Sequence, residues 1–354
     1  MQNYQKIKTK ILEKKRLSLE EYTDLFNWNL LLLGILADQC RENIFKNNEV
    51  GFIIDRNITF SDICVVQCDF CAFYKKEKKS VISLSLEKIL EKIDKLQQIG
   101  GTQVMLQSGL NPNYGLSFYK MLVSTIKKNY PKIYIHSFSP AEIYYLAKKE
   151  NLSYKKVLIS LKESGLDSLP GAAEILSDRV RKIISPQKLM SEDWLKIMET
   201  AHLIGMETTS TMTFGIIETK QERIEHLLKI RNLQDKTNGF RAFIPWTFSP
   251  QNTKLSHIVQ TSGEDYLKTV AISRIVLDNI KHIHSGWVTE GWKLGQIALL
   301  MGANDLGGIL MDEVVVKSTG LINTASKEHI IKTIKQIGKI PVERNSRYEV
   351  LKKY

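Results

Sequence analysis

Short strand patterns and amphipathic helical patterns alternate along the chain from about residue 51 onward. This alternation favours an α/β fold with a parallel sheet, most simply a closed (β/α) barrel of the TIM type. In such barrels the functional groups sit on the loops that follow the strands. The predicted strands cover residues 53–60, 104–107, 133–136, 168–169, 208–213, 242–245, 283–288 and 314–316.

Helical periodicity fills the segments between these strands. Within 86–99 the apolar residues recur at the spacing of one helix face, with Ser85 placed as the N-cap and Gly100 as the stop. The first 48 residues also have helical patterns, and Ser18 with Glu21 forms a capping-box sequence. We therefore predict an N-terminal helical extension over 1–48 and a barrel with C-terminal elements packed on it over 49–354. The remaining predicted helices cover 116–128, 139–149, 154–164, 192–204, 221–233, 263–279 and 290–300.

Composition restricts the surroundings in which such a chain works. No run approaches the roughly 20 apolar residues of a membrane span, and the N-terminus lacks the apolar region of a secretory signal. We therefore expect a cytoplasmic protein with no membrane partner. The net charge of +12 is compatible with a nucleic-acid partner. However, the lysines are scattered and do not interleave with aromatic residues, so solvated helix faces are the favoured interpretation and no nucleic-acid partner is expected.

Three of the four cysteines, Cys64, Cys68 and Cys71, lie directly after the first predicted strand in the spacing Cys-x3-Cys-x2-Cys. Such clustering is not a disulfide framework. A structural zinc site usually needs four ligands, often in two Cys-x2-Cys pairs, and no second pair exists in this sequence. Three thiolates can instead hold a four-iron cluster and leave one iron open to an external ligand. The fourth cysteine, Cys40, lies in an apolar helical segment and is expected to be a small core residue.

The spacing Cys-x3-Cys-x-aromatic-Cys, with Phe70 at the aromatic position, resembles the signature of the radical S-adenosylmethionine (SAM) superfamily. The resemblance implies a 4Fe–4S cluster on the three cysteines, with the amine and carboxylate of SAM on the fourth iron. One electron from the reduced cluster would cleave the sulfonium and yield a 5′-deoxyadenosyl radical. A flavodoxin or ferredoxin is the electron donor that the resemblance implies.

The same resemblance suggests which residues contact SAM. Phe70 is expected near the adenine, and the turn formed by Gln107, Ser108 and Gly109 near the amino group. Glycine allows the backbone to approach a ligand closely. Ser108 occupies the position where relatives carry a second glycine, and an ordinary strand-end turn is the alternative interpretation.

Segments spread over about residues 15 to 350 resemble the menaquinone (futalosine-route) and deazaflavin group of radical SAM enzymes. They include GGTQVMLQSGLNP, HSFSPAEI, GLDSLPGAAEIL, TMTFGIIET and GANDLGG. The segments AFIPWTFSPQNT and HSGWVTEGWKLGQIAL favour the futalosine cyclases within this group. The implied reaction on dehypoxanthine futalosine is hydrogen abstraction from the ribose, addition to the benzoate ring, and loss of a proton and an electron. Aminofutalosine synthases and deazaflavin-forming enzymes remain alternatives, and a basic zinc protein that contacts nucleic acid is an alternative of another class.

A substrate of this kind needs partners for its sugar hydroxyls and a cation for its carboxylate. Thr209, Thr211 and Thr213 alternate along a strand and share one face, so they are predicted to line the barrel around SAM. Strand propensity alone is the competing explanation. Arg241 is a candidate for the benzoate carboxylate because its planar guanidinium matches carboxylate geometry, and a surface salt bridge is its alternative. His136 is predicted to be polar site lining or, equally, a satisfied core histidine.

The remaining candidates are carboxylates and polar residues near predicted strand ends. Glu174 is a candidate partner for the sugar or the SAM ribose, with a helix-start carboxylate as the alternative. The resemblance indicates that the loop around Gly171 is one residue shorter than in relatives. No base for the final proton can be chosen without geometry. The candidate catalytic residues are Glu174, Glu218 and Asp305, and the further substrate-binding candidates are Asp167, Ser168 and Asn252.

Overall fold

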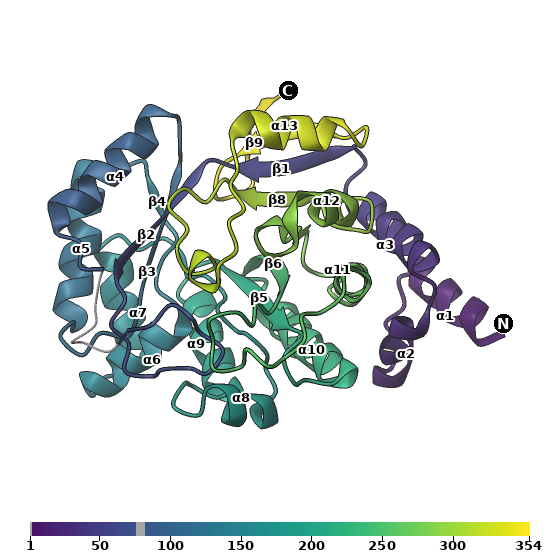
Figure 1. The fold of residues 1–354 in the computed structure, drawn as a ribbon, viewed down its shortest axis with the longest axis horizontal. Helices are drawn as coiled ribbons and strands as arrows, with labels where there is room; N and C mark the ends of the chain where they lie inside the picture. The colour runs from purple at the N-terminus through teal and green to yellow at the C-terminus, as the bar shows by residue number, and fades with distance from the viewer. Residues whose placement is uncertain (1, 76–81) are drawn as a thin grey trace.

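The computed structural model describes residues 2–75 and 82–354. The described strands are short and the helices carry most of the regular structure (Figure 1). The strands are β1 (Glu49–Ile53), β2 (Asp55–Ser61), β3 (Gln103–Ser108), β4 (Tyr134–Ile135), β5 (Thr208–Phe214), β6 (Phe240–Thr247), β7 (His282–Ile283), β8 (Asp305–Gly308), β9 (Ile340–Arg344) and β10 (Val350–Lys353). The first helices are α1 (Gln2–Leu12), α2 (Leu19–Asp24), α3 (Leu30–Ile44), α4 (Leu86–Gln98), α5 (Leu116–Asn129), α6 (Pro140–Lys149) and α7 (Tyr154–Glu163). They are followed by α8 (Asp178–Ile184), α9 (Ser191–Leu203), α10 (Lys220–Thr237), α11 (Gly263–Val276), α12 (Trp287–Ala298) and α13 (Lys327–Lys335).

The described strands form three sheets, and all neighbouring strands run parallel except β9 and β10. The sheet orders are β10-β9-β1-β8, β2-β3-β4 and β5-β6-β7. Isolated parallel bridges lie between the sheets. They pair Arg56 with Met311, His136 with Ser168, Leu169 with Thr208, and His284 with Asp305. The architecture is therefore α/β with parallel strands, as predicted.

Two sequence devices determine where several helices begin. Ser85 accepts a hydrogen bond from the backbone N–H of Lys88 at the start of α4, and Gly100, at φ +78°, follows its end. Ser18 with Glu21 forms the predicted capping box of α2. Figure 1 shows α4, α5, α10 and α11 outside the strands, with α1 to α3 at the N-terminal side. There α3 packs against α11 and α2 against α10.

Some predicted strands are wrong. Residues 314–316 form a turn, and the eighth strand is the glycine-containing β8 instead. Its glycines allow neighbouring backbones to come close, since a Cβ on Gly308 would lie 2.0 Å from an oxygen of Asp55. The predicted strand 283–288 is shorter, because Trp287 begins α12. Residues 168–169 make only isolated bridges, and the predicted strand 53–60 is divided between β1 and β2.

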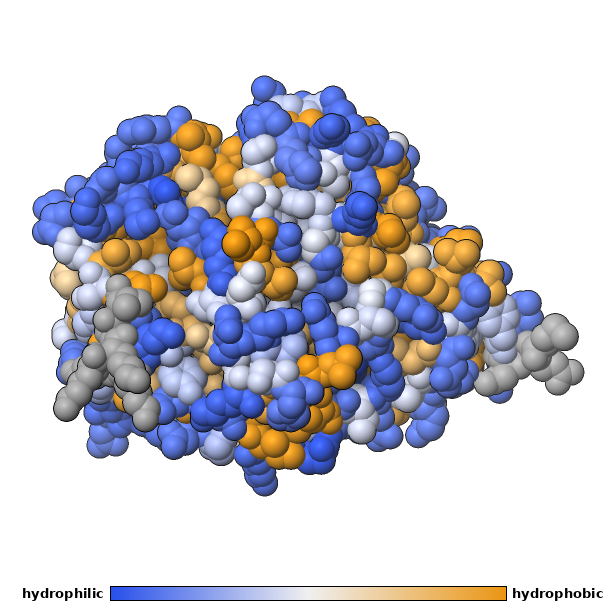
Figure 2. Space-filling model, viewed as in Figure 1, coloured by the Kyte–Doolittle hydropathy of each residue, from blue (hydrophilic) through white to orange (hydrophobic). Residues whose placement is uncertain are grey.

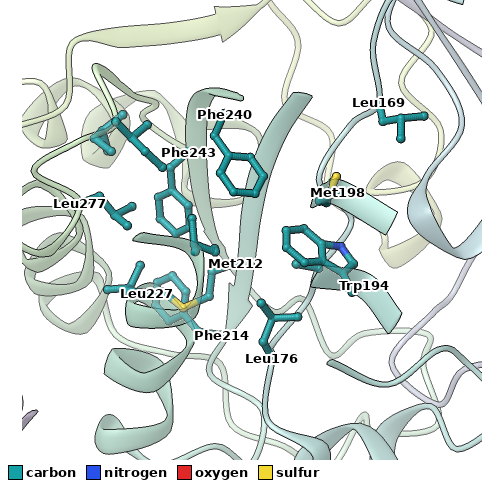
Figure 3. Close-up of a cluster of buried hydrophobic side chains, with 14 of the residues drawn as sticks. Leu169, Leu176, Trp194, Met198, Met212, Phe214, Leu227, Phe240, Phe243 and Leu277 are labelled. Atoms are coloured by element: carbon teal, nitrogen blue, oxygen red, sulfur yellow. The ribbon is translucent and has the colours of Figure 1, made fainter. Parts of the chain in front are cut away.

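Strand β5 has one face in the hydrophobic core and the opposite face turned away from it. Successive side chains of a strand point to opposite faces. Met212 and Phe214 are fully buried in the core cluster between the strands and helices α9 and α10, together with Trp194, Phe240 and Phe243 (Figure 3). The alternate threonines therefore face the opposite side.

The described surface is mostly hydrophilic on the face shown in Figure 2, with hydrophobic residues exposed around α3. These include Leu31, Leu32 and Ile35. Among the described helices, none combines the length and the apolar character that crossing a bilayer requires. Cys40 on α3 is partly buried and packs against the core, as expected.

Candidate active site at the cysteine loop

A cavity of about 460 Å³ is lined by residues of several of the parallel strands and of the segments that connect them. Its wall combines the segment 62–75, called the cysteine loop below, with strands β3, β5, β6 and β8 and the turn 344–348 that joins β9 to β10. Because parallel strands start at one end and finish at the other, the cavity has two distinct ends. The cysteine loop follows the last residue of β2, whereas the turn 344–348 meets the first residues of β6 and β8.

The cysteine loop is held by backbone hydrogen bonds to neighbouring segments and within the loop itself. The N–H of Val65 donates to the carbonyl of Leu110 at 3.1 Å, and the N–H of Asp69 donates to Ile184 at the end of α8 at 2.8 Å. Within the loop, the N–H of Cys71 donates to the carbonyl of Cys68 at 3.1 Å. These bonds place all three loop cysteines in the cavity wall.

The donors that the cysteine loop offers to a cofactor are three thiols. No group of three His, Cys, Asp or Glu side chains in the described segments converges tightly enough to hold one metal ion. A 4Fe–4S cluster instead binds each thiolate on a separate iron. Burial raises the pKa of Cys68 to about 12 and also raises that of Cys71, while the ammonium of Lys188 opposes both shifts. The number of thiols in the loop matches the three protein ligands of such a cluster, which would bind them as thiolates.

The turn after β3 lies against the cysteine loop. Gln107, Ser108 and Gly109 all line the cavity, together with Phe70. A Cβ on Gly109 would lie 2.2 Å from the carbonyl oxygen of Ile63, so glycine is required there by the neighbouring loop. These four residues are thus gathered around the cysteines, as the interpretation of a SAM site requires.

The threonines of β5 face the cavity together. Thr211 accepts a hydrogen bond from the N–H of Ala173 at 3.0 Å, and Thr213 accepts one from the indole of Trp246 at 2.6 Å. Thr209 lies 3.3 Å from Nε2 of His136. The face that these three threonines share therefore forms part of the polar cavity wall and not of the hydrophobic core.

Glu174 lines the cavity at 7% exposure and lies before α8 rather than in its first turn. Its carboxylate accepts hydrogen bonds from Lys188 at 2.5 Å and from Arg181 at 3.4 Å. Its backbone has φ +47°, and that of Ala172 has φ +44°, so two non-glycine residues of one loop are held in the left-handed region. Such local strain is typical of loops shaped for a ligand.

Lys188 and Glu142 line the cavity but were not among the candidates chosen from the sequence. Lys188, in the segment ISPQK, lies 5.6 Å above the ring of Phe70 and next to the cysteines. Glu142 is buried in the cavity wall, where its carboxylate accepts a 2.6 Å hydrogen bond from the N–H of Ser139, and burial raises its pKa to about 7. The Ser-Pro-x-Glu sequence signals only the capping box that these residues form on α6.

At the other end of the cavity, His136 and Arg241 lie together. Nδ1 of His136 is 2.9 Å from the hydroxyl of Ser168, which accepts a 2.7 Å hydrogen bond from Arg241. Arg241 also donates to the carbonyl of Ser346. Burial, followed by the charge of Arg241, lowers the pKa of His136 far below its ordinary value, so this imidazole is neutral at pH 7.

The turn 344–348 closes this end. Arg344 makes two hydrogen bonds to the buried carboxylate of Asp305, at 2.5 and 2.7 Å. Tyr348 has a positive φ of +64°. Its hydroxyl forms a 2.6 Å hydrogen bond with Nε2 of His284, and its ring stacks on that of His282 at a centroid distance of 3.7 Å. Burial lowers the pKa of His284 to about 4.

Several candidate residues lie outside the cavity wall. Asp167 pairs with Lys127 at 2.6 Å and accepts from the N–H of Ile135. Glu218 accepts from the N–H groups of Gly215 and Ile216 and pairs with Arg223. Asn252 is exposed and donates to the carbonyl of Ser318. Ser168 and Asp305 do not line the cavity themselves. Ser168 contacts the cavity residues Arg241 and His136, and Asp305 contacts Arg344 and lies 3.4 Å from His284.

Comparison with known proteins matches two family models to this chain. The model described as "Radical SAM superfamily" matches residues 58–230, and "CofH/MqnC C-terminal region" matches residues 237–354. The first match contains the cysteine loop, and the second contains Arg241 and the turn 344–348.

Curated relatives are similar over nearly the whole chain. A cyclic dehypoxanthine futalosine synthase of Streptomyces coelicolor is 42% identical, covering 95% of this chain and 86% of the relative. A protein of the same name from Halalkalibacterium halodurans is 38% identical, covering 96% and 93%. A 5-amino-6-(D-ribitylamino)uracil–L-tyrosine 4-hydroxyphenyl transferase of Methanosarcina barkeri is 42% identical, covering 88% and 85%.

The fold is also that of a solved structure. Methylornithine synthase superposes with a TM-score of 0.74 at 20% identity, covering 95% of this chain and 97% of that one. At this identity the likeness establishes the fold alone. Taken with the family models and the relatives, it shows that the chain belongs to the radical SAM superfamily of enzymes, which use a 4Fe–4S cluster and SAM, and within it to the group with the CofH/MqnC C-terminal region.

Proposed function

We propose that this chain cyclises dehypoxanthine futalosine to cyclic dehypoxanthine futalosine, a step of menaquinone biosynthesis. The observation that carries the proposal is the extent of the similarity to the named synthases, which covers 95% of the chain at 42% identity. The two family-model matches contain the cysteine loop and the C-terminal turn, respectively, and these line opposite ends of one cavity.

The cysteine end would hold the cofactors. Cys64, Cys68 and Cys71 bind the cluster, and Phe70 with Gly109 and its neighbours borders SAM. When bound, the cluster and SAM supply a carbon-centred radical that removes hydrogen from a nearby C–H bond. The charge of Lys188, beside the thiols, favours their ionised form.

The rest of the wall would position the substrate and exclude water. A reactive radical takes hydrogen from whichever C–H bond lies within reach, so the protein must present only one. Thr209 and Thr211 offer hydroxyls toward the ribose, and Glu142 and Glu174 offer carboxylates. Glu142 has a pKa of about 7, which suits a group that holds a proton at a sugar hydroxyl.

We also propose that the three sheets close into one barrel around the cavity. The isolated bridges support this. The segment 168–169 bridges the end of β4 to β5, His284 after β7 pairs with Asp305 of β8, and Arg56 of β2 pairs with Met311 after β8. A barrel would enclose the substrate on all sides and leave the cysteine end for a reductant, which we propose to be a flavodoxin or ferredoxin.

The similarity to the tyrosine-using transferases favours a second candidate function, transfer of a 4-hydroxyphenyl group, because one of them is also 42% identical. A direct comparison separates the two. The anaerobically reconstituted protein would be incubated with SAM, dithionite and either dehypoxanthine futalosine or 5-amino-6-(D-ribitylamino)uracil with tyrosine.

The cyclase proposal predicts cyclic product from the first mixture and only uncoupled 5′-deoxyadenosine from the second. Cys40→Ala is the matched control and should retain turnover, whereas Cys68→Ala should lose it. If the wild type forms no cyclic product while its cluster is intact, the cyclase assignment is wrong.

A further inference from the structure

Two arginines line the cavity in the described part of the chain, and they differ in how their charge is neutralised. Arg344 has the carboxylate of Asp305 at 2.5 Å. Arg241 has only neutral partners: the hydroxyl of Ser168, the carbonyl of Ser346, Nδ1 of His136 at 3.4 Å, and the ring of Tyr134 at 5.1 Å. A guanidinium inside a cavity without a counter-ion is unfavourable unless a ligand supplies the charge.

The other charged groups nearby leave Arg241 without a partner. Asp305 is engaged by Arg344. Asp55, also in the wall, accepts from the N–H of Leu310 and from Gln103, and burial raises its pKa to about 6. The pKa values of His136 and His284 are lowered by burial, so neither ring contributes charge at pH 7. Asp55 remains mostly ionised at pH 7, but it accepts hydrogen bonds from Leu310 and Gln103 and not from Arg241, so no described carboxylate pairs with Arg241.

Two hydrogen-bond donors beside each other also lack acceptors among the described residues. They are Nε of Arg241 and the hydroxyl of Ser346, whose side chain is 3% exposed. Buried donors without acceptors are costly, and an acceptor group bound in the cavity would satisfy both of these. The two residues are in contact, since Arg241 donates to the carbonyl of Ser346. A carboxylate, with two acceptor oxygens, matches this pair.

We propose that Arg241 and Ser346 form an anion subsite that binds the carboxylate of the substrate's benzoate ring. This inference rests on the cyclase function proposed above. It also fixes the orientation of the substrate. Arg241 lies at the start of β6, and the cysteine loop follows the end of β2, so a benzoate at Arg241 directs the sugar toward the cysteines. That is the end at which the ribose hydrogen has to be removed.

The test compares dehypoxanthine futalosine with its carboxamide, which keeps the shape but not the charge. Binding of each to the cluster-loaded protein with SAM would be measured by equilibrium dialysis. We expect the wild type to prefer the acid by about tenfold or more, the size of one charge-assisted contact. Arg241→Gln should bring the two affinities together while the affinity for the amide changes little, and Arg241→Lys should keep part of the preference.

Arg347→Gln is the matched control, because Arg347 is exposed in the same turn and does not line the cavity. It should retain the full preference. If Arg241→Gln fails to load its cluster, Ser346→Ala decides instead, with an expected loss of about two- to fivefold in the preference for the acid. An unchanged preference in the folded variant would overturn the subsite. Cyclic product from a wild type that binds acid and amide equally would overturn the subsite alone, whereas absence of cyclic product would remove the proposed function.

Discussion

The indole Nε1 of Trp194 donates a 2.8 Å hydrogen bond to the backbone carbonyl of Gly171. Trp194 is fully buried on α9 and lies about parallel to Phe240 (Figure 3). Gly171 begins the strained loop that carries Glu174 into the cavity, and a Cβ there would lie 2.6 Å from the backbone nitrogen of Thr211. This hydrogen bond therefore connects a side chain of the hydrophobic core to the loop that forms part of the active-site wall.

We expect Trp194→Phe to lower both stability and turnover. The ring is largely retained, but the carbonyl of Gly171 loses its donor inside the protein, which costs about 1–3 kcal/mol. Urea denaturation would measure the free energy of unfolding, and single-turnover assays the activity. Trp194→Ala should cost about 3–5 kcal/mol because a cavity is added. Unchanged turnover in Trp194→Phe would show that the loop does not depend on this bond.

Replacing any one of Cys64, Cys68 or Cys71 with Ala should prevent stable cluster binding. We expect iron content to fall from about four per chain to well below that after anaerobic reconstitution, together with loss of the brown absorbance. Cys40→Ala removes a thiol that packs against the core, away from the cavity wall, and should keep full iron content. Iron and sulfide analysis of all four variants provides the measurement. Full iron in a loop variant would contradict the ligand assignment.

Arg344→Met should destabilise the protein more than the double change Arg344→Met with Asp305→Asn. The single variant leaves the carboxylate of Asp305 buried without its partner, which costs about 3–5 kcal/mol. Removing the carboxylate charge as well should recover part of this loss. Denaturant unfolding of the wild type, both single variants and the double variant gives the coupling energy. Additive effects would mean that the two residues do not stabilise each other.

Stability should fall on acidification partly because of His202. Burial lowers its pKa from 6.5 to about 4, and its ring nitrogens contact the hydroxyls of Thr237 and Thr208. Below pH 6.5 the unfolded chain gains a proton that the folded chain takes up only near pH 4. The free energy of unfolding therefore decreases as the pH falls through this window.

His202→Gln should reduce the slope of the unfolding free energy against pH by the equivalent of up to one proton. Urea denaturation midpoints measured between pH 4 and 7 give this slope. The exposed His257→Gln is the control and should leave the slope unchanged. An identical slope in His202→Gln would contradict the assignment.

Patterns local in sequence predicted most of the helices and the parallel character of the strands, although α8 and α13 were not predicted. The periodicity of 86–99 and the cap at Ser85 depend only on neighbouring residues, so α4 matches within a residue. In contrast, β9 and β10 were not predicted, because β9 is stabilised by pairing with β1 about 290 residues earlier along the chain. Strand β8 was not predicted either, because glycine has a low strand propensity, and Gly308 instead allows close packing against Asp55.

The residues of the candidate site show the same difference between local sequence patterns and long-range contacts. The cysteine spacing and the threonine alternation are visible in the sequence, and both sets line the cavity. Glu218 was indistinguishable from a site residue until its backbone partners were known. Lys188 and Tyr348 could not be selected, because their roles come from tertiary contacts with Glu174 and His284.

The turn 344–348 has a consequence for how the protein is made. During synthesis the segment that walls the far end of the cavity emerges long after the cysteine loop, and β1 cannot complete its pairing until β9 has been translated. For most of that time the thiols are exposed on an unfinished scaffold. Iron loading is therefore expected to follow translation rather than accompany it, so that a ribosome-stalled chain lacking the last twenty or so residues would not retain a cluster.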